Sequence, residues 1–279
     1  MRGKKVKEPK QKKIKEKKKK EKEIYVPVAP LLGDAPDYHV HIPAMKDKII
    51  GFILGFGVGM VVVMVFFRSI LLSIIVSAVL GYFAIDIYNN YLLEKRKQTL
   101  LLQFKDLLET LTASYSAGLN TRDAFKDAIN DMVDIYGEDA DIVAEVDLIN
   151  DGMASNFTIE KLLENFAQRS GLDDIESFAN VFDACLRQGA NIKDVISQTR
   201  DIINDKIEME MEIKTLLASN QNELYIMLVM PLVIMLTLSG MSDLSVVSNT
   251  PINVVVKLIS IGIFIGAFFL GKKITKIEM

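Results

Sequence analysis

Residue types that could do covalent or metal chemistry are rare in this chain. Its 279 residues include one cysteine, Cys185, and two histidines, His39 and His41. Cys185 falls on the apolar stripe of a helix expected over residues 174–188, which favours a small core residue over a reactive thiol. Two imidazoles in a Pro-bearing segment, without a third ligand nearby, make a poor metal site. We therefore expect no metal and no cofactor.

Sequence motifs for known chemistries are also missing. The chain has no GxxxxGK[ST] phosphate loop, no Gly-rich dinucleotide turn, no HExxH and no paired cysteines. Catalysis by this chain alone is not expected, so we predict that it is not an enzyme. A helical acidic domain also argues against nucleic acid as a partner, because binding to phosphates needs basic patches.

Acidic side chains are the groups best suited to recognise a partner. Residues 94–223 hold 13 basic and 26 acidic residues, a balance of −13, whereas residues 1–48 hold 15 basic and 7 acidic, a balance of +8. The acids gather within two consecutive predicted helices and include Asp131, Asp134, Glu138, Asp139, Asp141 and Glu145. They form either a solvated face or a contact surface for a basic partner. Our candidate partner-binding residues are Asp131, Asp134, Glu138 and Asp139.

Two similar turns separate the helices that must position these acids. SAGLNTRDAF (116–125) and RQGANIKDVI (187–196) align at an offset of 71 residues, which indicates a weak internal repeat. In each, a glycine suits a left-handed helix end, an asparagine can cap the next helix, and an aspartate three residues later can bond back to a free amide. The residues concerned are Gly118, Asn120 and Asp123 in the first turn, and Gly189, Asn191 and Asp194 in the second.

Apolar periodicity predicts helices throughout the region between and around the turns. The expected helices cover residues 94–117, 121–136, 138–151, 158–169 and 174–188, and a last one runs onward from residue 192. No helix breaker separates the first from the apolar run before it, or the last from the apolar run that contains Pro231. Both helices should therefore continue into a membrane.

Four apolar runs have the length of membrane spans: residues 49–67, 70–85, 224–238 and 252–270. Glycines at four-residue spacing in the first run, and small residues at the same spacing in the second, predict a tight hairpin. The fold class is thus all-α: a polytopic membrane protein with two N-terminal and two C-terminal transmembrane helices. Between them lies a helical-bundle domain containing a degenerate repeat.

The predicted domain organisation has four parts. Residues 1–48 form a Lys-rich tail, disordered in its first 23 residues, and a Pro-bearing extended linker over residues 24–45. Residues 49–93 form a transmembrane hairpin, residues 94–223 the helical domain, and residues 224–279 the second transmembrane pair. The tail is suited to contact anionic membrane lipids.

The distribution of lysine and arginine predicts the orientation. The tail, residues 95–97 and residues 272–276 are basic, while the opposite loops contain only Arg68 and nearby Lys257. By the positive-inside rule, both termini and the central domain are cytoplasmic in a multi-pass protein of the inner cell membrane.

The order of these elements resembles the inner-membrane platform proteins of Tad-type (type IV-like) pilus assembly, within the type II secretion system F family. The resemblance covers about residues 50–275. It is carried by FKDLLETLTASYSAGLNTRDAF (104–125), LLENFAQRSGLDDIESFANVF (162–182), RQGANIKDVI (187–196) and LLASNQNELYIMLVMPLVI (216–234). Among these proteins the TadB-like member is favoured over the TadC-like one.

Such a resemblance implies a non-catalytic scaffold that couples a cytoplasmic hexameric secretion ATPase to pilin subunits. It also implies a homo-oligomer, or a hetero-oligomer with a sister platform protein. Two other classes fit the residues alone: a membrane transporter or channel subunit, and a membrane-anchored signalling adaptor. The near absence of unpaired intramembrane charge argues against the transporter, and the adaptor would differ by lacking any dependence on a secretion ATPase.

Overall fold

The protein is all-helical over the residues that the computed structural model describes, which are 28–33, 36–39, 43, 45–67, 70–189, 191–240, 262 and 266. Within them lie seven helices and no strand: α1 (Met45–Phe67), α2 (Ile70–Ser116), α3 (Thr121–Tyr136), α4 (Asp141–Ala154), α5 (Ile159–Ser170), α6 (Asp173–Gln188) and α7 (Ile192–Gly240). The predicted all-α class is therefore confirmed for this part of the chain. The Lys-rich tail and most of the predicted fourth span lie outside the described residues.

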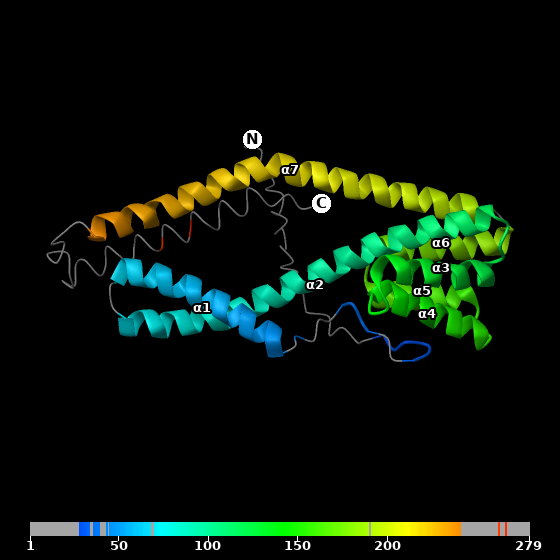
Figure 1. The fold of residues 1–279 in the computed structure, drawn as a ribbon, viewed down its shortest axis with the longest axis horizontal. Coiled ribbons are helices and arrows are strands. Elements are labelled where there is room, and N and C mark those ends of the chain that lie inside the picture. The colour runs from blue at the N-terminus through cyan, green and yellow to red at the C-terminus, as the bar shows by residue number, and fades with distance from the viewer. Residues whose placement is uncertain are drawn as a thin grey trace, which may run out of the picture.

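Helices α1 and the first half of α2 form an apolar hairpin (Figure 1). Both are long and apolar enough to cross a membrane by length and composition, and most of their side chains are not covered by protein. Small residues bring the two backbones together, since a Cβ on Gly55 would lie 2.3 Å from that of Ala84, and one on Gly59 would lie 3.2 Å from Cα of Ser77. This close approach is what the small-residue spacing predicts.

Two long helices connect this hairpin with a helical domain at the other end of the molecule (Figure 1). Helix α2 spans 47 residues without a break, from the apolar run to Ser116. Helix α7 spans 49 residues, packs along α2 and continues through Pro231. Its C-terminal part contains the predicted third span, residues 224–238. The presence of four spans remains a prediction.

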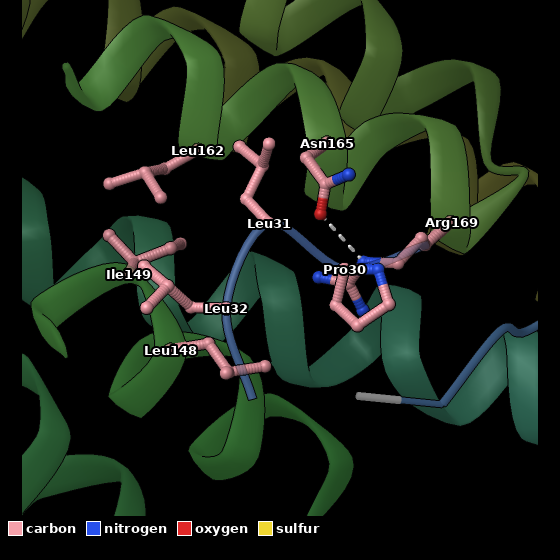
Figure 2. Close-up of a pocket in the computed structure, with 8 residues that line it drawn as sticks. All are labelled: Pro30, Leu31, Leu32, Leu148, Ile149, Leu162, Asn165 and Arg169. Atoms are coloured by element: carbon pink, nitrogen blue, oxygen red, sulfur yellow. Dashed lines mark hydrogen bonds between the residues drawn. The ribbon is translucent and has the colours of Figure 1, made fainter. Parts of the chain in front are cut away.

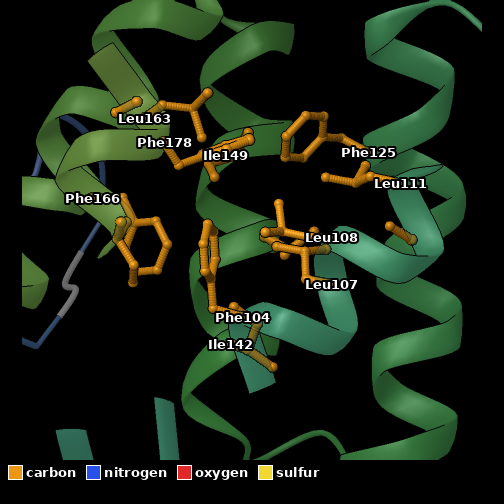
Figure 3. Close-up of a cluster of buried hydrophobic side chains, with 14 of the residues drawn as sticks. Phe104, Leu107, Leu108, Leu111, Phe125, Ile142, Ile149, Leu163, Phe166 and Phe178 are labelled. Carbon is orange, nitrogen blue, oxygen red and sulfur yellow. The ribbon is translucent and has the colours of Figure 1, made fainter. Parts of the chain in front are cut away.

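The helical domain packs α3, α4, α5 and α6 against the second half of α2 and the start of α7. Its core is rich in aromatic residues: the Phe104 ring lies 6.1 Å from that of Phe166 and 5.4 Å from that of Phe178, measured between centroids (Figure 3). Leu107, Leu108 and Leu111 of α2 fill the space beside them and are almost fully buried. Edge-to-face contacts of this kind add to the apolar burial that holds the helices together.

Helix bounds agree closely with the apolar periodicity, with one shift of three residues. Helix α4 begins at Asp141 rather than at 138, because Gly137 has φ +83° and ends α3 through a bond from its amide to Val133 O. Residues 137–140 then form a turn, in which the Ala140 amide bonds to Gly137 O. Glu138 and Asp139 consequently lie on a loop.

Part of the segment that the sequence predicts as an extended linker is packed on the helical domain. Tyr38 is 1% exposed, and its backbone amide donates to Arg169 O at 3.0 Å. Residues 30–32 lie against α4 and α5. These described residues therefore belong to the folded domain in space, although they precede both apolar helices in the chain.

Candidate functional site

Four of the six acids singled out in the sequence are exposed. Asp131 and Asp134 lie on the last turns of α3, and Glu138 and Asp139 lie in the loop that follows. They form a continuous acidic segment along the chain at one edge of the domain. The structure thus leaves all four candidate partner-binding residues accessible.

The other two acids are not part of a free acidic face, contrary to that interpretation. Asp141 is half-buried and accepts two bonds from Arg96 of α2, at 2.8 Å from Nε and 2.5 Å from Nη2. The hydrogen bond to Asp141 raises the pKa of the Arg96 guanidinium. Arg96, which the sequence counts among the membrane-flanking cations, therefore fastens α2 to the N-terminus of α4.

Glu145 is fully buried and pairs with Arg169 across α4 and α5. The guanidinium donates to both carboxylate oxygens, at 2.7 Å from Nη1 and 2.5 Å from Nη2, and the Tyr38 hydroxyl donates to Oε1 at 2.9 Å. Burial raises the pKa of Glu145, and the bonds from Arg169 oppose this rise. Burial also raises the pKa of Tyr38, as does the charge of Glu145. A two-pronged pair with a third donor satisfies groups that would be costly to leave unpaired in the core.

The two predicted turns have the expected glycine geometry. Gly118 has φ +86° and Gly189 has φ +66°, and the Gly189 amide bonds to Cys185 O at the end of α6. Asn120 caps α3 by accepting from the Asp123 amide at 3.0 Å. In the second turn Asn191 Nδ2 donates to the Asp194 carboxylate at 2.9 Å. These residues shape the chain at the two helix ends.

The structure describes the surroundings of Cys185 and His39. Cys185 is half-buried, not fully in the core as its stripe suggests. His39 Nδ1 lies 3.2 Å from the Asp37 carboxylate, and His41 lies outside the described residues. No group of three or more potential metal-ligating side chains is found where the structure describes the chain.

The buried network of Tyr38, Glu145 and Arg169 was not identified from the sequence. A signal for it exists, because Glu145 falls on the apolar stripe of α4 with Ile142 and Ile149, and Arg169 follows the buried Phe166 by three residues. A charged residue on an apolar stripe requires a partner of opposite charge. Two such residues of opposite charge on successive helices could therefore have been predicted to pair. No comparable pattern in the sequence indicates that Tyr38 joins them.

Comparison with known proteins supports one family. Residues 107–240 match the family model described as type II secretion system (T2SS), protein F, which covers the end of α2 and the whole of α3 to α7. Proteins of this family are inner-membrane proteins and are generally non-catalytic platforms of secretion or pilus assembly. No curated protein and no solved structure gives a significant match.

Proposed function

We propose that the protein is the inner-membrane platform of a Tad-type or type IV-like pilus assembly machine, with its helical domain and both termini in the cytoplasm. In this function it transmits the motion of a hexameric secretion ATPase to pilin subunits in the membrane. The TadB-like member fits best. It would act as a homo-oligomer, or beside a sister platform protein, and would perform no catalysis of its own.

The observation that carries this proposal is the continuity of α2 and α7. Each runs as one helix between the helical domain and the end of the molecule that holds the apolar hairpin (Figure 1). A displacement of one end of a continuous helix is passed on to its other end, so a movement of the domain would reach the apolar segments. Pro231 removes one backbone hydrogen bond from α7, so α2 is the stiffer of the two connections. Two parallel connections suit a force-transmitting scaffold better than a tethered adaptor domain.

The exposed acids of residues 131–139 are the proposed contact for the ATPase. They lie at the end of α3, which is fixed to α2 by the bond from the Tyr136 hydroxyl to Asp106 and by the buried Met132. A basic surface of a motor would be attracted to them, and its movement would reach α2 directly. Pilin would be contacted on the opposite side of the molecule, by the apolar helices.

A charge reversal tests the proposal. Replacing Asp131, Asp134, Glu138 and Asp139 by lysine should abolish piliation and weaken co-purification of the ATPase. Membrane insertion and helicity should remain, because all four side chains are exposed. The weakened association should also respond differently to salt, since exposed charges are screened over about 10 Å at 0.1 M salt.

A matched control reverses four exposed acids outside that segment: Asp147, Asp151, Glu164 and Glu176. It changes the net charge by the same amount and should leave piliation intact. Normal pili on cells with the first set reversed would show that residues 131–139 are solvated surface only. Loss of pili with both sets would assign the effect to overall charge.

A further inference from the structure

The N-terminal arm, defined as the described residues 28–33 and 36–39, lies in a groove between α4 and α5. Pro30, Leu31 and Leu32 line a pocket together with Leu148, Ile149, Leu162, Asn165 and Arg169 (Figure 2). A Cβ on Gly33 would lie 2.9 Å from the Leu148 side chain, so the arm follows this surface closely. The arm thus occupies an apolar groove of the helical domain before the chain has entered α1.

Backbone groups of the arm are bound by α5. Asn165 Nδ2 donates to Ala29 O at 3.0 Å, and Arg169 Nη1 donates to Pro36 O at 3.3 Å. In the opposite direction, the Tyr38 amide donates to Arg169 O at 3.0 Å. Because the arm forms no helix or strand, these bonds replace the partners that regular structure would supply.

Tyr38 joins three helices at the inner end of the arm. Its hydroxyl donates to Glu145 of α4, its amide bonds to Arg169 of α5, and its ring lies under Arg96 of α2, with Cζ 4.8 Å from the ring centroid. Burial of an aromatic ring and a cation over its face both favour this position. Tyr38 is therefore the anchor of the arm.

The groove has its own supporting bonds that do not involve the arm. Arg169 is oriented by Glu145 and by a bond from its Nε to Asn165 Oδ1 at 2.9 Å. Gly171, with φ +58°, leaves the space beside α5 that the His39 ring fills, since a Cβ there would lie 2.3 Å from Nε2 of His39. The groove between α4 and α5 therefore fits an extended segment that carries a tyrosine next to its last residue.

The position of the arm limits where α1 can begin. Helix α1 starts at Met45, six residues after His39. An extended chain covers at most about 3.6 Å per residue, so the start of α1 stays within about 20 Å of the arm's end. We propose that the N-terminal arm is a clamp, anchored by Tyr38 in the α4–α5 groove, that holds the start of α1 to the helical domain.

This clamp gives the domain a third connection to the apolar hairpin, beside α2 and α7. It restrains the start of α1, whereas the chain connection to α2 is at the other end of α1, after Phe67. The inference rests on contacts within one chain and does not depend on the proposed function. Its test accordingly measures distances and amide exchange, without reference to pili or to an ATPase.

The experiment compares two glycine substitutions in the full chain, reconstituted in lipid nanodiscs on a Cys185→Ser background. Gly171→Ala places a Cβ against His39, while Gly189→Ala meets no atom within 4 Å. Both glycines end a helix in the left-handed conformation, at φ +58° and +66°, so the backbone strain is matched. Only the first substitution should disturb the arm, because the His39 ring must move aside to make room for the new Cβ.

Two readouts follow the arm and α1 separately. Hydrogen exchange at the Tyr38 amide should accelerate by about tenfold or more in Gly171→Ala, because the bond to Arg169 O and the burial around it are lost. The distance distribution between spin labels on cysteines at Met45 and Ser177, both exposed, should broaden in the same variant. Gly189→Ala should match the parent in both.

Tyr38→Ala is the second variant, and circular dichroism verifies that its helices are retained. It should release the arm at least as fully as Gly171→Ala does. The inference is overturned if the Tyr38 amide of the parent exchanges like an unprotected amide. It is equally overturned if either variant frees the arm while the distance distribution stays as narrow as in the parent, or if both variants leave the arm protected.

Discussion

The two Gly-Asn turns have similar local geometry but opposite surroundings. At the first, a 47-residue helix ends and a 16-residue helix begins; at the second, a 16-residue helix ends and a 49-residue helix begins. We call α2 with α3 the first hairpin, and α6 with α7 the second. The turn determines where a helix stops. The residues beyond it determine whether the next helix stays in the domain or runs toward the apolar end of the molecule (Figure 1).

The two hairpins are also fastened differently. In the first, the Tyr136 hydroxyl near the end of α3 donates to Asp106 of α2. In the second, Lys206 Nζ of α7 lies 2.7 Å from the Asp174 carboxylate of α6. The two contacts have similar places in the repeat. Tyr136 follows Asn120 by 16 positions and Lys206 follows Asn191 by 15, and in each case the acid precedes the glycine of the turn. The first contact is a hydrogen bond donated by a phenol hydroxyl to a carboxylate, and the second is a partly exposed ion pair. We call these two contacts the closures of the hairpins.

Breaking the Glu145–Arg169 pair, which joins the two helices between the hairpins, should have the largest effect. Arg169→Met leaves Glu145 buried without its counter-ion, and we expect a loss of about 3–5 kcal/mol in the free energy of unfolding. Combining it with Glu145→Leu should recover part of this loss, because the buried charge is removed while the Tyr38 hydroxyl loses its acceptor. Denaturation of the solubilised protein measures both. A double variant no more stable than the single one would show that packing, rather than the uncompensated charge, is responsible.

The glycines of the two turns should be equally sensitive to substitution. Gly118→Val and Gly189→Val add a side chain into open space at positive φ, so each should cost about 1–2 kcal/mol from backbone strain alone. Gly57→Val, also in open space but without a positive φ, is the control and should not destabilise. An unchanged denaturation midpoint for Gly118→Val would mean that the turns have been wrongly paired.

The smallest effects are expected at the two closures, which should respond to different solution conditions. The Tyr136–Asp106 closure should respond to pH. Burial and the bond to Asp106 raise the pKa of Tyr136 to about 12. The pKa of tyrosine in the unfolded chain is about 10. The stability that the Tyr136–Asp106 bond contributes is therefore fully present below about pH 10 and is lost as the pH rises through about 12. Tyr136→Phe should therefore reduce the alkaline loss of stability, measured by thermal unfolding between these values.

The second closure should respond to salt instead. Rising salt weakens a partly exposed ion pair, so Lys206→Met should reduce the salt dependence of stability by a fraction of a kcal/mol. An equal salt response in Tyr136→Phe and Lys206→Met would remove the distinction between the closures.

Much of the domain could be predicted from the sequence because local signals decide it. Apolar periodicity gave the helices, and Gly118 and Gly189 marked their ends, since a positive φ is a requirement of the backbone itself. The buried position of Tyr38 could not be predicted. Tyr38 lies 107 residues before Glu145 in the sequence, in a segment without a helical or strand period. Asp141 and Glu145 were misread for a related reason: composition does not distinguish an exposed acid from one whose partner is on another helix.

The most direct test of the account concerns the side of the membrane on which the helical domain lies. A cysteine at Ser177, exposed on α6, is introduced on a Cys185→Ser background, and intact cells are treated with a membrane-impermeant maleimide. We expect no labelling until the cells are permeabilised, whereas a cysteine at Ser248, in the predicted external loop, should be labelled at once. Labelling at Ser177 in intact cells would place the domain outside and contradict the proposed coupling to a cytoplasmic motor.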